Sequence, residues 1–129
     1  MSSAPTTGVL ICDDVDMMRT LLREAVGAQP SLHVVGEARD GDEAVTEARR
    51  LQPDVILLDL SMPKRTGLSA LPEIVQVAPA AKIIVLSGFV TSTIAADVLA
   101  LGAQQFIEKG TDIVAILDAI ESVVTSTVR

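Results

Sequence analysis

Residues 55–63 read Val55-Ile56-Leu57-Leu58-Asp59-Leu60-Ser61-Met62-Pro63. An unbroken aliphatic run between Pro53 and Pro63 is too short for a typical helix. It is typical of a strand buried on both faces, as in parallel sheets. The run carries Asp59 to its end, and open α/β sheets form their sites at the carboxyl ends of such strands. Because a buried carboxylate needs a compensating partner, Asp59 is the first candidate for chemistry.

The length and composition indicate one domain with an aliphatic core. The chain has 129 residues, of which 49% are hydrophobic, and two phenylalanines are its only aromatic residues. A chain of this size buries a core without disulfides or metal. We expect a flexible polar leader at 1–7, a single domain at 8–125 and a short tail at 126–129.

The charge balance excludes several classes of partner. With a formal net charge of -7, the chain repels phosphate backbones and anionic lipids, so we expect no direct contact with nucleic acid or a membrane surface. Basic surfaces or a divalent cation suit it better. Cys12 is the only cysteine, which excludes an internal disulfide. No apolar run approaches the roughly 20 residues of a membrane-spanning helix and no secretory signal is present, so a cytoplasmic location is expected.

Strand and helix patterns alternate along the chain about five times. Besides the run that ends at Asp59, we expect strands at 8–12, 32–36, 82–86 and 105–108. Helical spacing of apolar residues predicts helices at about 16–28, at 44–51, after Gly67, at 91–101, and from a cap at Thr111 or Asp112 to Val124. The expected fold is α/β: a flavodoxin-like, doubly wound (βα)5 arrangement with a five-stranded parallel sheet and helices on both faces.

Two local expectations follow from single residues. Pro72 lacks a backbone donor and is best tolerated in a first helical turn, so the third helix is predicted to begin nearer 70 than 67. Asp16 and Arg19 are expected to be solvated residues at the start of the first helix.

Polar residues follow four of the expected strands. Asp13 and Asp14 come after the first strand, Asp59 after the third, Ser87 after the fourth and Lys109 after the fifth. In a parallel sheet all carboxyl ends point the same way, so these side chains should meet in one crevice. Each residue alone is more simply a turn or surface residue, and the joint order is what favours a site.

The residue types indicate the chemistry of this crevice. Carboxylates at 13, 14 and 59 would repel one another, and a hard divalent cation with oxygen ligands relieves that repulsion. Mg2+ fits best, since it binds one or two carboxylates and bridges to phosphoryl oxygens. Asp59 would then attack phosphorus and form an aspartyl phosphate, while Lys109 and the Ser87 hydroxyl contact the other phosphoryl oxygens.

From Val9 to Val124 the chain resembles the receiver domains of response regulators in two-component signalling. The motifs occur in the order of the family: Asp13-Asp14, Asp59, Met62-Pro63, Gly67, Ser87, Phe106 and Lys109. The stretch Leu32–Ala38 with Asp40-Gly41 further resembles receivers of the LuxR/NarL-type class, which precede a helix-turn-helix domain.

This resemblance implies roles for individual residues. Asp14, Asp59 and the main-chain carbonyl of Ser61 would bind Mg2+, with Asp13 assisting through water, and a sensor histidine kinase would donate the phosphoryl group. Ser87 and Phe106 would form the switch. The residues two after the phosphoacceptor and two after the hydroxyl residue tune phosphoryl lifetime in this family, and here they are Ser61 and Phe89.

The resemblance also implies partners. Phosphorylation would change the face made by the 91–101 helix, the last strand and the last helix, which would contact an output domain or partner protein, or form a homodimer. The chain would be either a free-standing receiver or a piece of a longer regulator, and in the second case the output would be DNA binding and transcription regulation through a domain outside this chain. The chain would be a phosphoacceptor with at most slow self-phosphorylation and autodephosphorylation, and not an enzyme.

Two alternatives stay open. One is a pseudo-receiver, an interaction module that works without phosphorylation. The other is a phosphatase of the haloacid dehalogenase kind, which also uses an aspartate nucleophile, Mg2+ and lysine. Those enzymes place the nucleophile after the first strand with a second acid two positions later, whereas here position 61 is Ser61 and Asp59 follows the third strand.

Overall fold

The computed structural model describes residues 6–88 and 92–125. Most of the expected leader, the expected tail at 126–129 and Phe89 lie outside the described residues. In chain order the elements are β1 (Thr7–Cys12), α1 (Asp16–Gly27), β2 (Leu32–Ala38), α2 (Gly41–Leu51), β3 (Val55–Asp59), α3 (Gly67–Val77), β4 (Lys82–Ser87), α4 (Ser92–Ala100), β5 (Gln105–Glu108) and α5 (Ile113–Thr125).

The strands form one parallel five-stranded sheet in the order β2-β1-β3-β4-β5. β3 lies at its centre, paired with β1 on one side and β4 on the other. All five residues of β3 are buried, as the aliphatic run predicts. The order reverses direction at β1, which makes the carboxyl ends of β1 and β3 the switch point where α/β sheets form sites. The doubly wound α/β fold expected from the alternation is confirmed.

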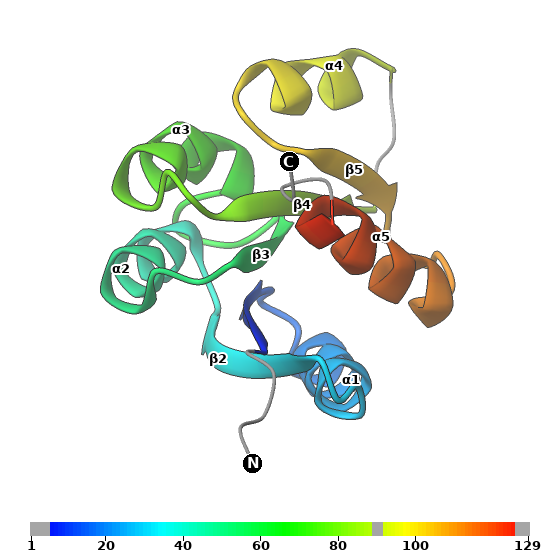
Figure 1. Ribbon diagram of the computed structural model, residues 1–129. Helices are drawn as coiled ribbons and strands as arrows, with labels where there is room; N and C mark the ends of the chain where they lie inside the picture. Colours follow the sequence, from blue (N-terminus) through cyan, green and yellow to red (C-terminus); the bar gives the residue numbers. More distant parts are fainter. Residues whose placement is uncertain (1–5, 89–91, 126–129) are drawn as a thin grey trace.

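Two apolar clusters cover the two faces of the sheet, and Figure 1 shows the helices divided accordingly. Leu10, Ile56 and Val85 point to the side of α2, α3 and α4. The intervening strand residues, such as Ile11 and Leu57, pack with α1 and α5. Alternate side chains of each strand therefore enter different clusters, which is why the central strands are apolar throughout.

The prediction that the third helix begins near residue 70 is wrong, because α3 begins at Gly67. The hydroxyl of Thr66 accepts a hydrogen bond from the Ser69 amide at 3.1 Å, and the Thr66 carbonyl accepts one from Ala70 at 3.0 Å. This cap fixes the start, since it satisfies donors of the first turn. Pro72 lies inside the helix and is exposed, where its missing N–H costs one helical hydrogen bond.

Aspartates cap two other helices. Asp40 is buried and accepts a hydrogen bond from the Glu43 amide at 2.8 Å, which begins α2. Of the two caps proposed for the last helix, Asp112 is the one observed: its carboxylate accepts from the Val114 amide at 3.0 Å. None of the helices in the described parts of the chain is long and apolar enough to cross a membrane.

Candidate functional site

The carboxyl edge of the sheet brings Asp13 and Asp59 together. Asp59 is the last residue of β3, and Asp13 follows directly on β1, its neighbour in the sheet. Both are almost completely buried, at 1% and 2% exposure, whereas the adjacent Asp14 is exposed. Asp13, Asp14 and Asp59 each offer a carboxylate oxygen, and these atoms all lie within 4.8 Å of one another. The convergence expected from the strand ends is therefore observed for all three acids.

Lys109 supplies the positive charge of the site. Its Nζ lies 2.9 Å from Asp13 Oδ2 and 3.1 Å from Asp59 Oδ2. The backbone N–H of Lys109 donates to the Ser87 carbonyl at 2.7 Å, which ties it to the end of β4. Gly110 then turns the chain with a φ of 92°, a conformation that favours glycine. One ammonium thus faces two buried carboxylates that come from different strands.

Burial dominates the electrostatics of this group. Burial of Asp59, with a further contribution from the charge of Asp13, raises the pKa of Asp59, although the Ser61 amide and Lys109 act in the opposite direction. The pKa of Lys109 is also raised: burial opposes its charge, but the neighbouring carboxylates of Asp13 and Asp59 outweigh that effect. The site therefore carries more negative charge than Lys109 alone compensates.

We expect Asp59→Asn to stabilise the protein at neutral pH in the absence of divalent cations, by on the order of 1 kcal/mol. A carboxyl whose pKa is raised on folding costs stability once it ionises in the native state. The gain should therefore shrink as the pH falls through the raised pKa, and vanish below the ordinary value of 3.8. Urea unfolding of both proteins between pH 3 and pH 8 measures this difference. A variant that is less stable than wild type at pH 7 would contradict the expectation.

The donor set fits a hard divalent cation. Asp13 Oδ2 is buried and, among the described residues, accepts no hydrogen bond; its approach to Lys109 is an ion pair without hydrogen-bond geometry. Asp13 and Asp59 thus share one ammonium between two buried carboxylates, and a divalent cation would supply the further positive charge that they need. Of the three carboxylates only Asp14 is exposed. A magnesium ion held by them would still be open to water or to a phosphoryl oxygen, which are ligands that Mg2+ prefers.

Of the other predicted residues, Ser61 and Ser87 lie at the same edge of the sheet. The amide of Ser61 donates to Asp59 Oδ1 at 3.2 Å, while its side chain is exposed. Ser87 is 2% exposed at the end of β4, next to the backbone of Lys109. Phe106 is half-buried in β5 and packs against the cluster that holds α2, α3 and α4. Phe89 lies outside the described residues.

Two glycines hold the loop after Asp59 in place. A Cβ added to Gly67 would lie 2.0 Å from the Asp59 carbonyl oxygen, and one added to Gly41 would lie 2.5 Å from the Arg65 carbonyl oxygen. Both positions also donate backbone hydrogen bonds across the loop, Gly67 to Leu60 at 3.0 Å and Gly41 to Arg65 at 2.7 Å. The resemblance includes both glycines, but no pattern in the sequence indicates that Gly41 contacts this loop.

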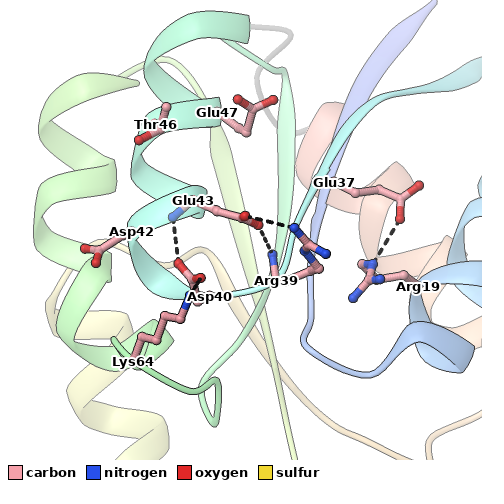
Figure 2. A pocket seen from close by; sticks show the side chains of 9 residues that line it. All are labelled: Arg19, Glu37, Arg39, Asp40, Asp42, Glu43, Thr46, Glu47 and Lys64. Carbon is pink, nitrogen blue, oxygen red and sulfur yellow. Dashed lines mark hydrogen bonds and ion pairs between the residues drawn. The ribbon is translucent and has the colours of Figure 1, made fainter.

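The expectation that Arg19 is solvated is wrong. Its side chain is 11% exposed and forms an ion pair with Glu37 at 3.1 Å. These two residues line one end of a pocket of about 640 Å3 beside the site, shown in Figure 2. The pocket's other charges are also paired, Arg39 with Glu43 and Lys64 with Asp40. These ion pairs link β2, α2 and the loop after β3, and they account for the charged residues that line the pocket without a bound ligand.

Comparison with known proteins agrees with this geometry. Residues 9–121 match the family model of the response regulator receiver domain. The chemotaxis protein CheY of Thermotoga maritima is 38% identical over 101 residues, which cover 78% of this chain and 83% of CheY. The transcriptional regulatory protein LiaR of Bacillus subtilis is 40% identical over 114 residues, but these span 88% of this chain and only 54% of LiaR.

Solved structures share the fold. The signal receiver domain of the putative response regulator NarL from Mycobacterium tuberculosis superposes with a TM-score of 0.89 at 26% identity, covering 95% of this chain and 98% of that one. The CheX–CheY–BeF3–Mg2+ complex from Borrelia burgdorferi gives a TM-score of 0.88 at 29% identity, covering 93% and 90%. With the family match over most of its length and these relatives, the chain belongs to the response regulator receiver domains, with likeness to LuxR/NarL-type members.

Proposed function

We propose that this receiver domain takes a phosphoryl group onto Asp59 from a sensor histidine kinase in the cytoplasm. Phosphorylation and Mg2+ binding are general to the family to which the chain belongs. The observation that carries the proposal for this chain is the group of Asp13, Asp14 and Asp59 with the ammonium of Lys109 between two of them. The same arrangement counts against the pseudo-receiver alternative, because a module that only binds a partner has no need of a buried cluster of charged groups.

The contacts of Asp59 support a role as nucleophile. One carboxylate oxygen accepts from the Ser61 amide and the other faces Lys109, so the carboxylate is held in one orientation. A carboxylate oxygen of Asp59 would attack phosphorus, and the new O–P bond would form as the bond from phosphorus to the histidine nitrogen of the kinase breaks. Lys109 would bind a phosphoryl oxygen and stabilise the charge that develops there.

The metal would share this pocket. Asp13, Asp14, Asp59 and the main-chain carbonyl of Ser61 would hold Mg2+, directly or through water, and its charge would neutralise the phosphoryl oxygens. The Borrelia burgdorferi CheY complex, which contains BeF3 and Mg2+, supports this assignment for a relative of the same fold.

We further propose that the phosphoryl group is read out through α4, β5 and α5. The Ser87 hydroxyl would move toward the phosphoryl group, and the half-buried Phe106 would fill the space that Ser87 leaves. Phosphorylation would thereby shift the equilibrium toward the conformation whose α4, β5 and α5 surface binds the partner. Ser61 and Phe89 would tune phosphoryl lifetime. The similarity to LiaR, a transcriptional regulatory protein roughly twice as long as the matched segment, supports an output in transcription through another domain, or through a partner or a second copy.

The test is intact mass spectrometry after incubation with acetyl phosphate and Mg2+. We expect a single phosphoryl adduct that disappears with EDTA and is abolished by Asp59→Asn. Steady release of phosphate from an added phosphomonoester would instead support the phosphatase alternative. An absence of adduct from wild type with both acetyl phosphate and a phosphorylated kinase would favour the pseudo-receiver.

A further inference from the structure

Arg19 on α1 connects the acidic site to strand β2. Its guanidinium donates from Nη1 to the main-chain carbonyl of Asp13 at 2.7 Å and from Nε to Glu37 at 3.1 Å. A third contact is an ion pair with Asp16. Three acceptors from different segments thus share one planar group that is nearly buried. Only an arginine side chain offers donors in several fixed directions.

The Asp13 carbonyl belongs to the peptide unit that joins Asp13 to Asp14. On its other side, the Asp13 amide donates to the Ala38 carbonyl at 2.9 Å, and Asp13 Oδ1 accepts from the Val15 amide at 2.9 Å. The side chain of Asp14 is exposed, so its position is set by the backbone that carries it. The bond from Arg19 fixes the plane of that peptide unit.

Glu37 holds Arg19 in this position. Figure 2 shows the two side chains facing each other at the end of β2. The second carboxylate oxygen of Glu37 pairs with Arg23 at 2.8 Å. Arg23 therefore shares a partner with Arg19, but within the described residues its ion pair is with Glu37 and not with the acidic site. The two arginines form a natural pair of test and control.

We propose that Arg19, held by Glu37, is a positioning residue that sets the peptide plane before Asp14 and thereby the affinity of the acidic pair for a divalent cation. The inference rests on the proposed function, in which Asp14 is a metal ligand. Groups that orient metal ligands without touching the metal commonly change affinity by about 10-fold to 100-fold when they are removed.

A positioning role and a purely electrostatic role of Arg19 predict opposite changes in Mg2+ affinity when Arg19 is replaced. Removal of a positive charge near an acidic site lowers the repulsion of Mg2+ and should tighten its binding. Loss of the bond to the Asp13 carbonyl lets the peptide unit before Asp14 reorient, and binding should weaken. Arg23→Gln removes an equal charge from the neighbouring turn of α1 but leaves the bond from Arg19 to the Asp13 carbonyl in place, so it reports the loss of charge without the loss of that bond.

The experiment titrates wild type, Arg19→Gln, Arg19→Lys and Arg23→Gln with Mg2+, following the backbone amide shifts of Asp14 and Ser61. We expect the Kd for Mg2+ to rise about 10-fold in Arg19→Gln and to stay unchanged or fall in Arg23→Gln. Arg19→Lys keeps the charge but cannot bridge Glu37 and the carbonyl, so its Kd should rise to an intermediate value. Hydrogen exchange of the Val15 amide without metal should quicken about 10-fold in Arg19→Gln.

Two results would overturn the proposal. One is a folded Arg19→Gln, or Arg19→Lys should the first not fold, that binds Mg2+ at least as tightly as wild type. The other is Val15 exchange that does not change. A wild type that fails to bind Mg2+ contradicts the proposed function instead, and the Val15 exchange then still decides whether Arg19 holds the turn.

Discussion

Lys109→Met should slow phosphorylation of the protein by acetyl phosphate about 100-fold, the effect of removing one preorganised donor to a developing charge. It should also lower the free energy of unfolding at pH 7 by about 2 kcal/mol, because it leaves Asp13 and Asp59 buried without their cationic partner. The part of this deficit that comes from ionised Asp59 should shrink in acid, as the pH falls through the raised pKa of that carboxyl. Adduct formation rates and urea unfolding at pH 7 and pH 3 measure these effects.

Lys64→Met is the matched control. It removes the same charge from the loop after β3, but Lys64 is 78% exposed and reaches Asp40 only at 4.0 Å. We expect less than about 0.5 kcal/mol of lost stability and an unchanged rate. Equal effects of the two substitutions, or a wild-type rate in Lys109→Met, would show that Lys109 is not the specific partner of Asp59.

Gly67→Ala should destabilise the protein by about 3 kcal/mol and displace the phosphoacceptor. Its Cβ would lie 2.0 Å from the Asp59 carbonyl oxygen, 2.9 Å from the Asp59 carbonyl carbon and 3.0 Å from Leu60 Cα. All of these are backbone atoms, so neither side-chain rotation nor local rearrangement of a flexible group relieves the clash. The end of β3 must shift, and adduct formation at Asp59 should slow with it. Thermal unfolding and the adduct rate test both effects.

Gly27→Ala serves as the comparison for this substitution. Gly27 ends α1, and nothing lies within 4 Å of its added Cβ. There the change should be neutral or stabilise by up to about 1 kcal/mol, since alanine has less backbone freedom to lose. Gly67→Ala with wild-type stability would mean that the loop does not pack on Asp59 as described.

The sheet and the acidic site could be predicted because both depend on local patterns. Apolar runs such as Val55–Leu58 identify buried strands, and parallel strands send all their carboxyl ends to one edge. This rule alone is enough to predict that Asp13, Asp59 and Lys109 lie close together. The site needed no information about which side chains pair across the fold.

Contacts between distant side chains could not be predicted in this way. Arg19 looks like any exposed arginine at the start of a helix, yet its side chain is nearly buried and pairs with Glu37, which lies 18 residues further along the chain. Pro72 misled for a related reason: propensity disfavours proline in a helix, but the Thr66 cap and the close packing of Gly67 fix the helix start independently. Tertiary structure overrode the local preference in both cases.

The most direct test of the account locates the phosphoryl group. Borohydride reduction converts an aspartyl phosphate to homoserine, so the protein phosphorylated with Mg2+ is reduced, digested and sequenced by mass spectrometry. The buried carboxylate of Asp59, oriented by the Ser61 amide and Lys109, predicts homoserine at position 59 and at neither 13 nor 14. Homoserine at position 13 or 14, or a stable adduct that yields none, would contradict the assignment of Asp59 as phosphoacceptor.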